Sequence, residues 1–169
     1  MIISIIIVII SLLLDGILSN FLPYLNNDLS IFTPLLTLVS IFMIYPFFKK
    51  KEKKYLITIF VIGIIYDLFY TNLLFFNGIL FVLIGLLTIL IYKRYEITPI
   101  RLLLYIIIVI TSYELLTVLI ILIFNLVPIT IYKVFYKIIH SLLLNIIYSE
   151  LLYLVIYLIP KKYKKISIN

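Results

Sequence analysis

The sequence predicts an all-α polytopic membrane protein. Hydrophobic residues make up 66% of the chain and charged residues only 12%, whereas about 25% of the residues of a soluble domain are charged. The apolar runs approach or exceed the roughly 20 residues that a helix needs to cross a bilayer, and most charges lie between these runs. We therefore expect a single integral membrane domain over residues 1–169, with six transmembrane helices arranged as three hairpins.

The six predicted helices follow from the apolar runs and the turn residues between them. The first run lacks a basic n-region and a small-x-small cleavage site, so we expect a retained helix rather than a signal peptide. PYLNNDLS separates the first two helices, and TNLLFFNG joins the third to the fourth. The longer segment NLVPITIYKVFYK could hold a short interfacial helix. The predicted spans are about 2–22, 31–48, 55–72, 76–92, 102–124 and 138–159.

The distribution of Lys and Arg predicts that both termini lie in the cytoplasm. Five basic residues fall in the second loop, three in the fourth and four in the C-terminal tail, whereas the first and third loops have none. Basic loops remain on the cytoplasmic side of a membrane. Lys133 and Lys137, in the fifth loop, would then lie outside. This pattern accounts for the net charge of +7 without a nucleic-acid partner.

The residue types that enzymes and metal sites require are scarce. The chain has no Cys and one His, His140, so no disulfide framework or zinc-thiolate site is available. It also lacks a HExxH motif, a P-loop and a Gly-x-Ser-x-Gly elbow. We predict no enzymatic activity, no cofactor and no metal site.

Two similar polar patterns interrupt the apolar runs. LLLDGILSN contains Asp15 and IIYDLFYTN contains Asp67, and each Asp is followed four residues later by a hydroxyl and five later by an Asn. A charged group at mid-bilayer costs about 2.5–3.5 kcal/mol, so both should face the bundle interior. They could line one pocket, contact the same partner, or simply bond a neighbouring helix. Gly63, one turn before Asp67, favours a close helix crossing.

Three further ionisable residues lie within predicted spans: Glu114, His140 and Glu150. The same cost predicts that they point inward and find hydrogen-bond partners. With Asp15 and Asp67, the predicted spans hold four carboxylates. A proton pathway through these four groups is one hypothesis, and packing against neighbouring helices is the other. The sequence does not assign a role to any of the three.

The stretch GIIYDLFYTNLLFFNGILFVLIG, from Gly63 to Gly85, resembles the MreD family of rod shape-determining proteins. Gly63, Asp67, Asn77 and Gly78 carry the match, together with the early Asp15 in the first helix. As architecture, the resemblance extends over nearly the whole chain, through its length, its six spans and its short basic loops. The fifth and sixth spans match only in hydropathy, so the resemblance implies nothing for Glu114, His140 or Glu150.

The resemblance implies a non-enzymatic scaffold of the bacterial cell-elongation machinery, which maintains rod shape by organising peptidoglycan synthesis. Its expected place is the bacterial cytoplasmic membrane, as a multi-pass protein surrounded by lipid bilayer. Its expected partners are an MreC-like bitopic protein and, through it, the MreB filament and peptidoglycan synthases. A structural or partner-binding polar site is expected at Asp15, Gly63, Asp67, Asn77 and Gly78.

One alternative comes from another class of protein. The substrate-binding membrane subunits of energy-coupling-factor vitamin transporters are six-span bundles of similar size that bind a small molecule near the outer face, where Asp15 and Asp67 would lie. However, the first helix of such subunits carries an Ala-x-x-x-Ala docking face, and this chain contains no Ala. The sequence leaves open the direct partner, the stoichiometry and the presence of a ligand within the bundle.

Overall fold

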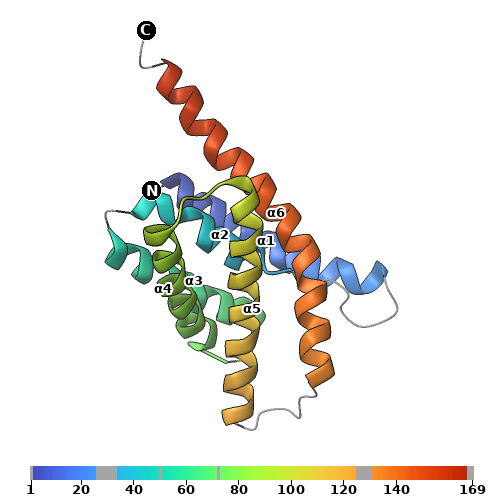
Figure 1. The fold of residues 1–169 in the computed structure, drawn as a ribbon. Helices are drawn as coiled ribbons and strands as arrows, with labels where there is room; N and C mark the ends of the chain where they lie inside the picture. The colour runs from blue at the N-terminus through green and yellow to red at the C-terminus, as the bar shows by residue number, and fades with distance from the viewer. Residues whose placement is uncertain (1, 26–33, 50, 72, 125–130, 167–169) are drawn as a thin grey trace.

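The computed structural model describes residues 2–25, 34–49, 51–71, 73–124 and 131–166. These residues form six α-helices and one short 3-10 helix, with no strand among them, as the sequence predicts (Figure 1). The helices are α1 (Ile2–Leu25), α2 (Leu36–Ile44), η1 (Tyr45–Phe48), α3 (Glu52–Tyr70), α4 (Phe76–Arg94), α5 (Pro99–Ile123) and α6 (Ile131–Ile166).

Four helices in the described part of the chain are long and apolar enough to cross a membrane, so this is a multi-pass membrane protein. The four segments are Ile3–Phe21, Phe76–Arg94, Pro99–Ile123 and Val134–Ile156. The apolar segment Leu36–Phe48 is shorter than a full span, and α3 carries Glu52, two Lys and Asp67 within 19 residues. The count of six spans and the orientation of the termini therefore remain predictions.

Two elements differ from their predicted extents. The second predicted span, 31–48, is helical only from Leu36 onward, and residues 31–33 lie outside the described residues. The segment before the sixth predicted span forms no separate interfacial helix where it is described, because α6 already begins at Ile131. The last turns of α6 extend past the other helices (Figure 1).

Helix α2 forms the centre of the bundle. Each of its nine residues is buried, and it contacts α1, α4, α5 and α6. A helix that is apolar all round, as LTLVSIFMI nearly is, can be buried on every side. The surrounding helices present aliphatic side chains outward; Leu13 on α1 and Leu104 on α5, for example, are more than half exposed. Such an apolar outer surface suits contact with lipid.

Helices α3 and α4 cross at their backbones. A Cβ atom added to Gly63 on α3 would lie 2.6 Å from the Cα of Gly78 and 2.7 Å from the carbonyl oxygen of Asn77 on α4. These distances leave no room for a side chain, and small residues of this kind let membrane helices approach closely. Gly63 and Gly78 thus hold α3 and α4 together as a tight hairpin.

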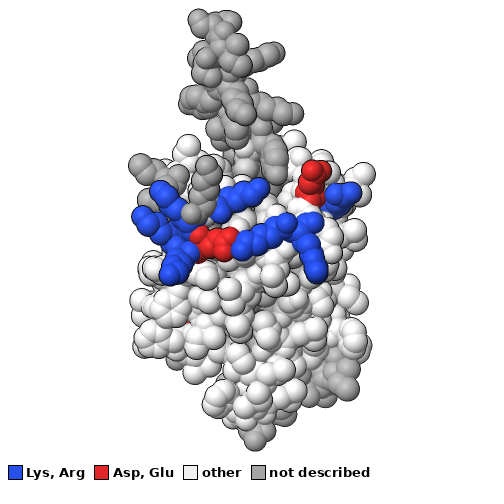
Figure 2. Space-filling view, turned by 60° about the vertical axis from the view of Figure 1, so that its left-hand side comes forward, with Lys and Arg blue, Asp and Glu red and all other residues white. Residues whose placement is uncertain are grey.

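Most exposed basic side chains of the described residues gather at one level of the molecule, and Lys137 on α6 is the exception. Figure 2 shows them as a band across an otherwise largely uncharged surface. The start of α1 and the end of α6 both lie toward this end of the bundle (Figure 1). This arrangement is compatible with the predicted cytoplasmic placement of both termini.

Candidate polar site at the helix starts

Asp67 lies at the end of α3 and caps the start of α4. Its side chain is buried, and its Oδ2 accepts a hydrogen bond of 2.9 Å from the backbone N–H of Asn77. The Asn77 side-chain Nδ2 donates to Oδ1 over 2.7 Å, and the Thr71 hydroxyl donates to the same oxygen over 2.8 Å. The first N–H groups of any helix lack intrahelical acceptors, and a carboxylate there also faces the positive end of the helix dipole.

The residue just before α4 cannot serve as the cap itself. Phe75 has no side-chain acceptor, and its φ of 67° lies in the left-handed region that bulky residues rarely adopt. The carboxylate from α3 therefore replaces the usual Ser, Thr, Asp or Asn cap. The network continues to α5, because the Tyr113 hydroxyl donates a 2.7 Å hydrogen bond to Oδ1 of Asn77. Three helices are thus joined through three buried side chains.

Asp15 on α1 does the same for α2. Its Oδ1 accepts from the backbone N–H of Leu36 over 2.7 Å, and its Oδ2 accepts from that of Thr37 over 2.8 Å. The preceding N–H, of Leu35, donates to Oδ1 of Asn145 on α6 over 2.9 Å. The start of α2 is buried, where an unsatisfied N–H would cost several kcal/mol. Side chains from two other helices therefore allow α2 to begin inside the protein.

The repeated Asp pattern thus corresponds to one structural device used twice, although its flanking residues behave differently. Thr71 bonds the carboxylate of Asp67, whereas the Ser19 hydroxyl donates to the backbone oxygen of Gly16 rather than to Asp15. Asn20 is exposed, and Asn72 lies outside the described residues. Among the described residues of the two patterns, the Asp is the one that is used in the same way in both hairpins.

A third carboxylate joins α5 to α6. Glu114 is 1% exposed, and its Oε2 lies 2.9 Å from Nζ of Lys137, whose side chain is 47% exposed. The other oxygen of Glu114, Oε1, has no hydrogen-bond donor among the described residues. From the sequence, Lys137 was expected to be a charge in the fifth loop, whereas it lies on α6. The signal that could have found the pair was a Lys on the sixth helix at the same end of the bundle as a Glu on the fifth.

A cavity of about 390 Å³ lies where these groups meet. Residues of five α-helices, and the residues just before α2, line it, including Asp15, Tyr66, Tyr70, Asn77, Glu114 and Lys137. Asp67 lies directly behind Asn77, and Gly63 and Gly78 hold the adjacent crossing. The structure therefore brings together Asp15, Asn77 and Glu114 around one space, which contains acceptors, a cation and aromatic hydroxyls.

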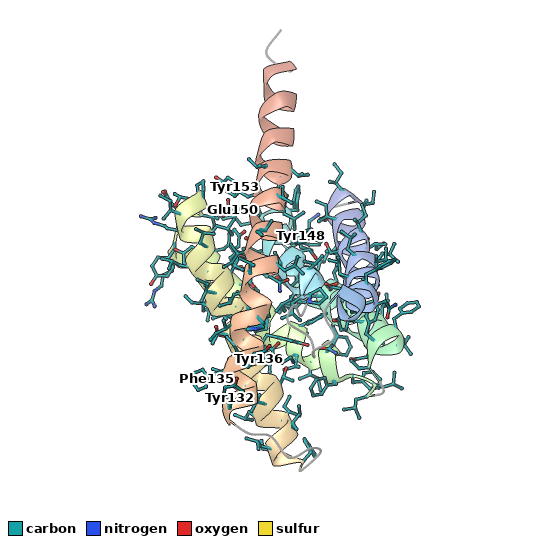
Figure 3. All side chains as sticks on the ribbon, turned by 90° about the vertical axis from the view of Figure 1, so that its right-hand side faces the viewer. Tyr132, Phe135, Tyr136, Tyr148, Glu150 and Tyr153 are labelled. Atoms are coloured by element: carbon teal, nitrogen blue, oxygen red, sulfur yellow. The ribbon has the colours of Figure 1, made fainter. Side chains whose placement is uncertain are left out.

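His140 and Glu150 lie elsewhere on α6. The His140 ring packs on Tyr136 with centroids 3.9 Å apart. Glu150 lies well away from Tyr136 along the helix (Figure 3), is only partly buried, and its Oε1 has no donor among the described residues. Neither residue lines the cavity. The four carboxylates therefore do not form a continuous file along the bundle, which disfavours the proton-pathway hypothesis.

Several polar groups that bind helices together were not singled out from the sequence. The Tyr70 hydroxyl donates to the backbone oxygen of Leu12 over 2.7 Å, and the hydroxyls of Tyr148 and Ser11 lie 2.6 Å apart. A Tyr within an apolar span signals such a bond, because its hydroxyl needs a partner when buried. Asn145 carried a similar signal, since a lone amide in a span must be satisfied by a neighbouring helix.

Among the described residues, no group of three or more His, Asp or Glu side chains could hold a metal ion. The described side chains of the site make hydrogen bonds and one ion pair, and Asp15 and Asp67 cap the helices that hold them.

Comparison with known proteins gives one result that covers almost the entire chain. The protein-family model described as rod shape-determining protein MreD matches residues 1–163. The match includes Asp15, Asp67, Asn77 and both members of the Glu114–Lys137 pair. No curated protein and no solved structure matches the chain.

Proposed function

Because the chain belongs to the MreD family of rod shape-determining proteins, we propose that it acts as a non-enzymatic membrane scaffold of the cell-elongation machinery. In this role it holds an MreC-like bitopic partner in the bacterial cytoplasmic membrane. Through that partner it organises the MreB filament and the peptidoglycan synthases that maintain a rod-shaped cell. The family match favours this function over the vitamin-transporter alternative.

One observation supports a binding role: the cavity is lined by polar side chains held between capped helices, and one buried carboxylate oxygen in its wall has no hydrogen-bond donor among the described residues. Asp15 and Asp67 fix the starts of α2 and α4 beside it, so its walls are preorganised, which lowers the entropic cost of binding. Oε1 of Glu114 has no donor among the residues that the structure describes, and a buried acceptor without a partner costs about 1–3 kcal/mol. A partner segment that supplies a donor to Glu114 would recover this free energy.

The hydrogen bonds of Asp15 and Asp67 support the non-enzymatic part of the proposal. Both oxygens of Asp15 accept backbone N–H groups, and both oxygens of Asp67 are engaged by the start of α4. A general acid or base must instead be free to exchange a proton with a substrate. Purified protein in lipid nanodiscs should turn over no lipid-linked wall precursor. Turnover that is lost in the His140→Ala variant would contradict this.

The binding role is tested by co-purification with the MreC-like protein of the same bacterium. Glu114→Gln retains the shape of the side chain but removes the charge that attracts a donor. It should lower the recovery of the partner severalfold and round the cells, while its level in the membrane stays near that of the wild type. The matched control is Glu96→Gln, which makes the same chemical change at an exposed residue and should alter neither readout. Normal partner recovery with Glu114→Gln would refute a role for the cavity.

A further inference from the structure

The basic band, far from the cavity, combines residues from several elements. Seven exposed basic side chains belong to it, and they follow η1, begin α3, end α4 and begin α5. They are Lys49, Lys51, Lys53, Lys54, Lys93, Arg94 and Arg101. Against them, the same segments carry two acidic residues, Glu52 and Glu96. Glu52 already pairs with Lys93, with Oε1 and Nζ 2.9 Å apart, so most of the positive charge is unbalanced.

The band borders a hollow and an apolar surface. The hollow measures about 410 Å³ and is lined by Glu52 and four Lys, at positions 49, 51, 53 and 54. One turn further along each helix, toward the middle of the bundle, lies an exposed aliphatic side chain. Ile57 on α3 and Leu90 on α4 are each 63% exposed, and Leu104 on α5 is 58% exposed. On each of three helices, a basic residue of the band thus has an exposed aliphatic residue one turn nearer the middle of the bundle.

We propose that this band is a binding site for anionic phospholipids. Their phosphate groups would contact the Lys and Arg side chains, and their acyl chains would lie along Ile57, Leu90 and Leu104. The basic side chains match the negative charge of the headgroup, since each Lys or Arg near a membrane surface attracts anionic lipid. The aliphatic residues one turn away match the rest of the same molecule. A free anion or an acidic peptide would use the cations alone.

The site can be measured with a single fluorescent reporter, because the chain contains no Trp. Ile57→Trp places the reporter one turn from Lys53 and Lys54. Its fluorescence is compared in vesicles of phosphatidylcholine mixed with either brominated phosphatidylglycerol or brominated phosphatidylcholine, since bromine quenches only at contact. We expect the relative binding constant for phosphatidylglycerol to exceed that for phosphatidylcholine by at least about threefold.

The matched control places the reporter at the opposite end of the bundle. Leu122→Trp replaces a residue on α5 that is 55% exposed and has no basic side chain of the band near it along the helix. Its relative binding constant should be close to one. Equal preference at both reporters, or no preference at Ile57→Trp, would overturn the proposal.

The double replacement Lys53→Gln and Lys54→Gln, made in the Ile57→Trp background, should reduce the preference toward one, and Glu96→Gln should not reduce it. Since basic residues also set orientation, a Leu74→Cys label in this Cys-free chain verifies that topology is unchanged. Relief of the quenching by excess inorganic phosphate would show a simple anion site and overturn the lipid assignment. Unaltered preference in the double variant with intact topology would also overturn it.

Discussion

The first two hairpins are built with the same capping device, yet they depend on different parts of the molecule. In the α3–α4 hairpin, the backbone N–H of Asn77 that Asp67 caps lies only ten residues after Asp67, and the two backbones cross at Gly63 and Gly78. In the α1–α2 hairpin, 21 residues separate Asp15 from the first N–H that it caps. Its cap is also incomplete without Asn145 from the last helix.

The difference shows that a helix cap can be made either within one hairpin or by a residue far away in the sequence. A short turn keeps Asp67 and Asn77 close whatever the rest of the chain does, so the second hairpin contains its own capping groups. The start of α2 instead requires α6 to be in place, because Leu35 has no other acceptor at its N–H among the described residues. The second hairpin should therefore be a self-contained unit, and the first should depend on the complete bundle.

The largest effect should come from breaking the backbone crossing of the second hairpin. A Cβ at Gly63 would meet backbone atoms of α4 at 2.6–2.7 Å, so Gly63→Ala must separate the two helices. We expect a loss of unfolding free energy at or above the upper end of the roughly 1–3 kcal/mol range for overpacked cores. It would be measured by equilibrium unfolding in detergent.

The matched control is Gly16→Ala on α1. There the added Cβ would meet only the end of the Tyr70 side chain, which can move aside at the cost of its hydrogen bond to the backbone oxygen of Leu12. Its loss of stability should be clearly smaller. Equal losses for the two variants would show that the crossing at Gly63 is not special.

The next largest effect should come from removing the caps. Asp67→Leu leaves the Asn77 N–H, the Asn77 amide and the Thr71 hydroxyl without their acceptor. The half-buried Thr71 hydroxyl keeps backbone acceptors within 3.4 Å, whereas each of the two buried Asn77 groups left unpaired costs about 1–3 kcal/mol, so we expect a total loss of about 3 kcal/mol. Asp67→Asn keeps one acceptor oxygen and should lose less than half as much. A pair of variants with equal stability would contradict the capping role, and thermal unfolding in detergent provides the measurement.

The dependence of the first hairpin on α6 predicts coupling between Asp15 and Asn145. Asn145→Leu alone should cost about 1 kcal/mol, the value of one helix cap. Combined with Asp15→Leu, it should cost less than the sum of the two single changes, because both serve the same helix start. Combined with Asp67→Leu, it should be additive. Additivity in both double variants would remove the proposed difference between the hairpins.

The smallest effect should come from the link between the second hairpin and α5. Tyr113→Phe removes only the hydroxyl that donates to Asn77. Interhelical hydrogen bonds in membrane proteins contribute about 0.6–2 kcal/mol, so a loss near the lower end is expected. Hydrogen exchange of the Asn77 and Gly78 amides, at the start of α4, should stay slow, because their acceptor is Asp67. Fast exchange there would show that the second hairpin is not self-contained.

Much of the fold followed from residue types and their order. Apolar runs and turn residues were enough to predict an all-helical membrane protein, and the cost of burying charge was enough to predict that Asp15 and Asp67 point inward. The partners of the two Asp side chains could not be predicted, because both bind backbone N–H groups, which every residue except Pro carries. No side-chain pattern marks such a partner.

From the residues alone we could predict the class of protein, the family motif around Gly63, Asp67, Asn77 and Gly78, and the basic clusters that form the band. These depend on local composition and short spacings. The folded structure was needed to show that α2 begins in the interior, that Asn145 completes its cap, and that Lys137 pairs with Glu114. The physical reason is that a buried polar group must be satisfied by whichever atoms lie nearest in space. In a bundle of similar apolar helices, those neighbours are chosen by the packing of helices that lie far apart in the sequence.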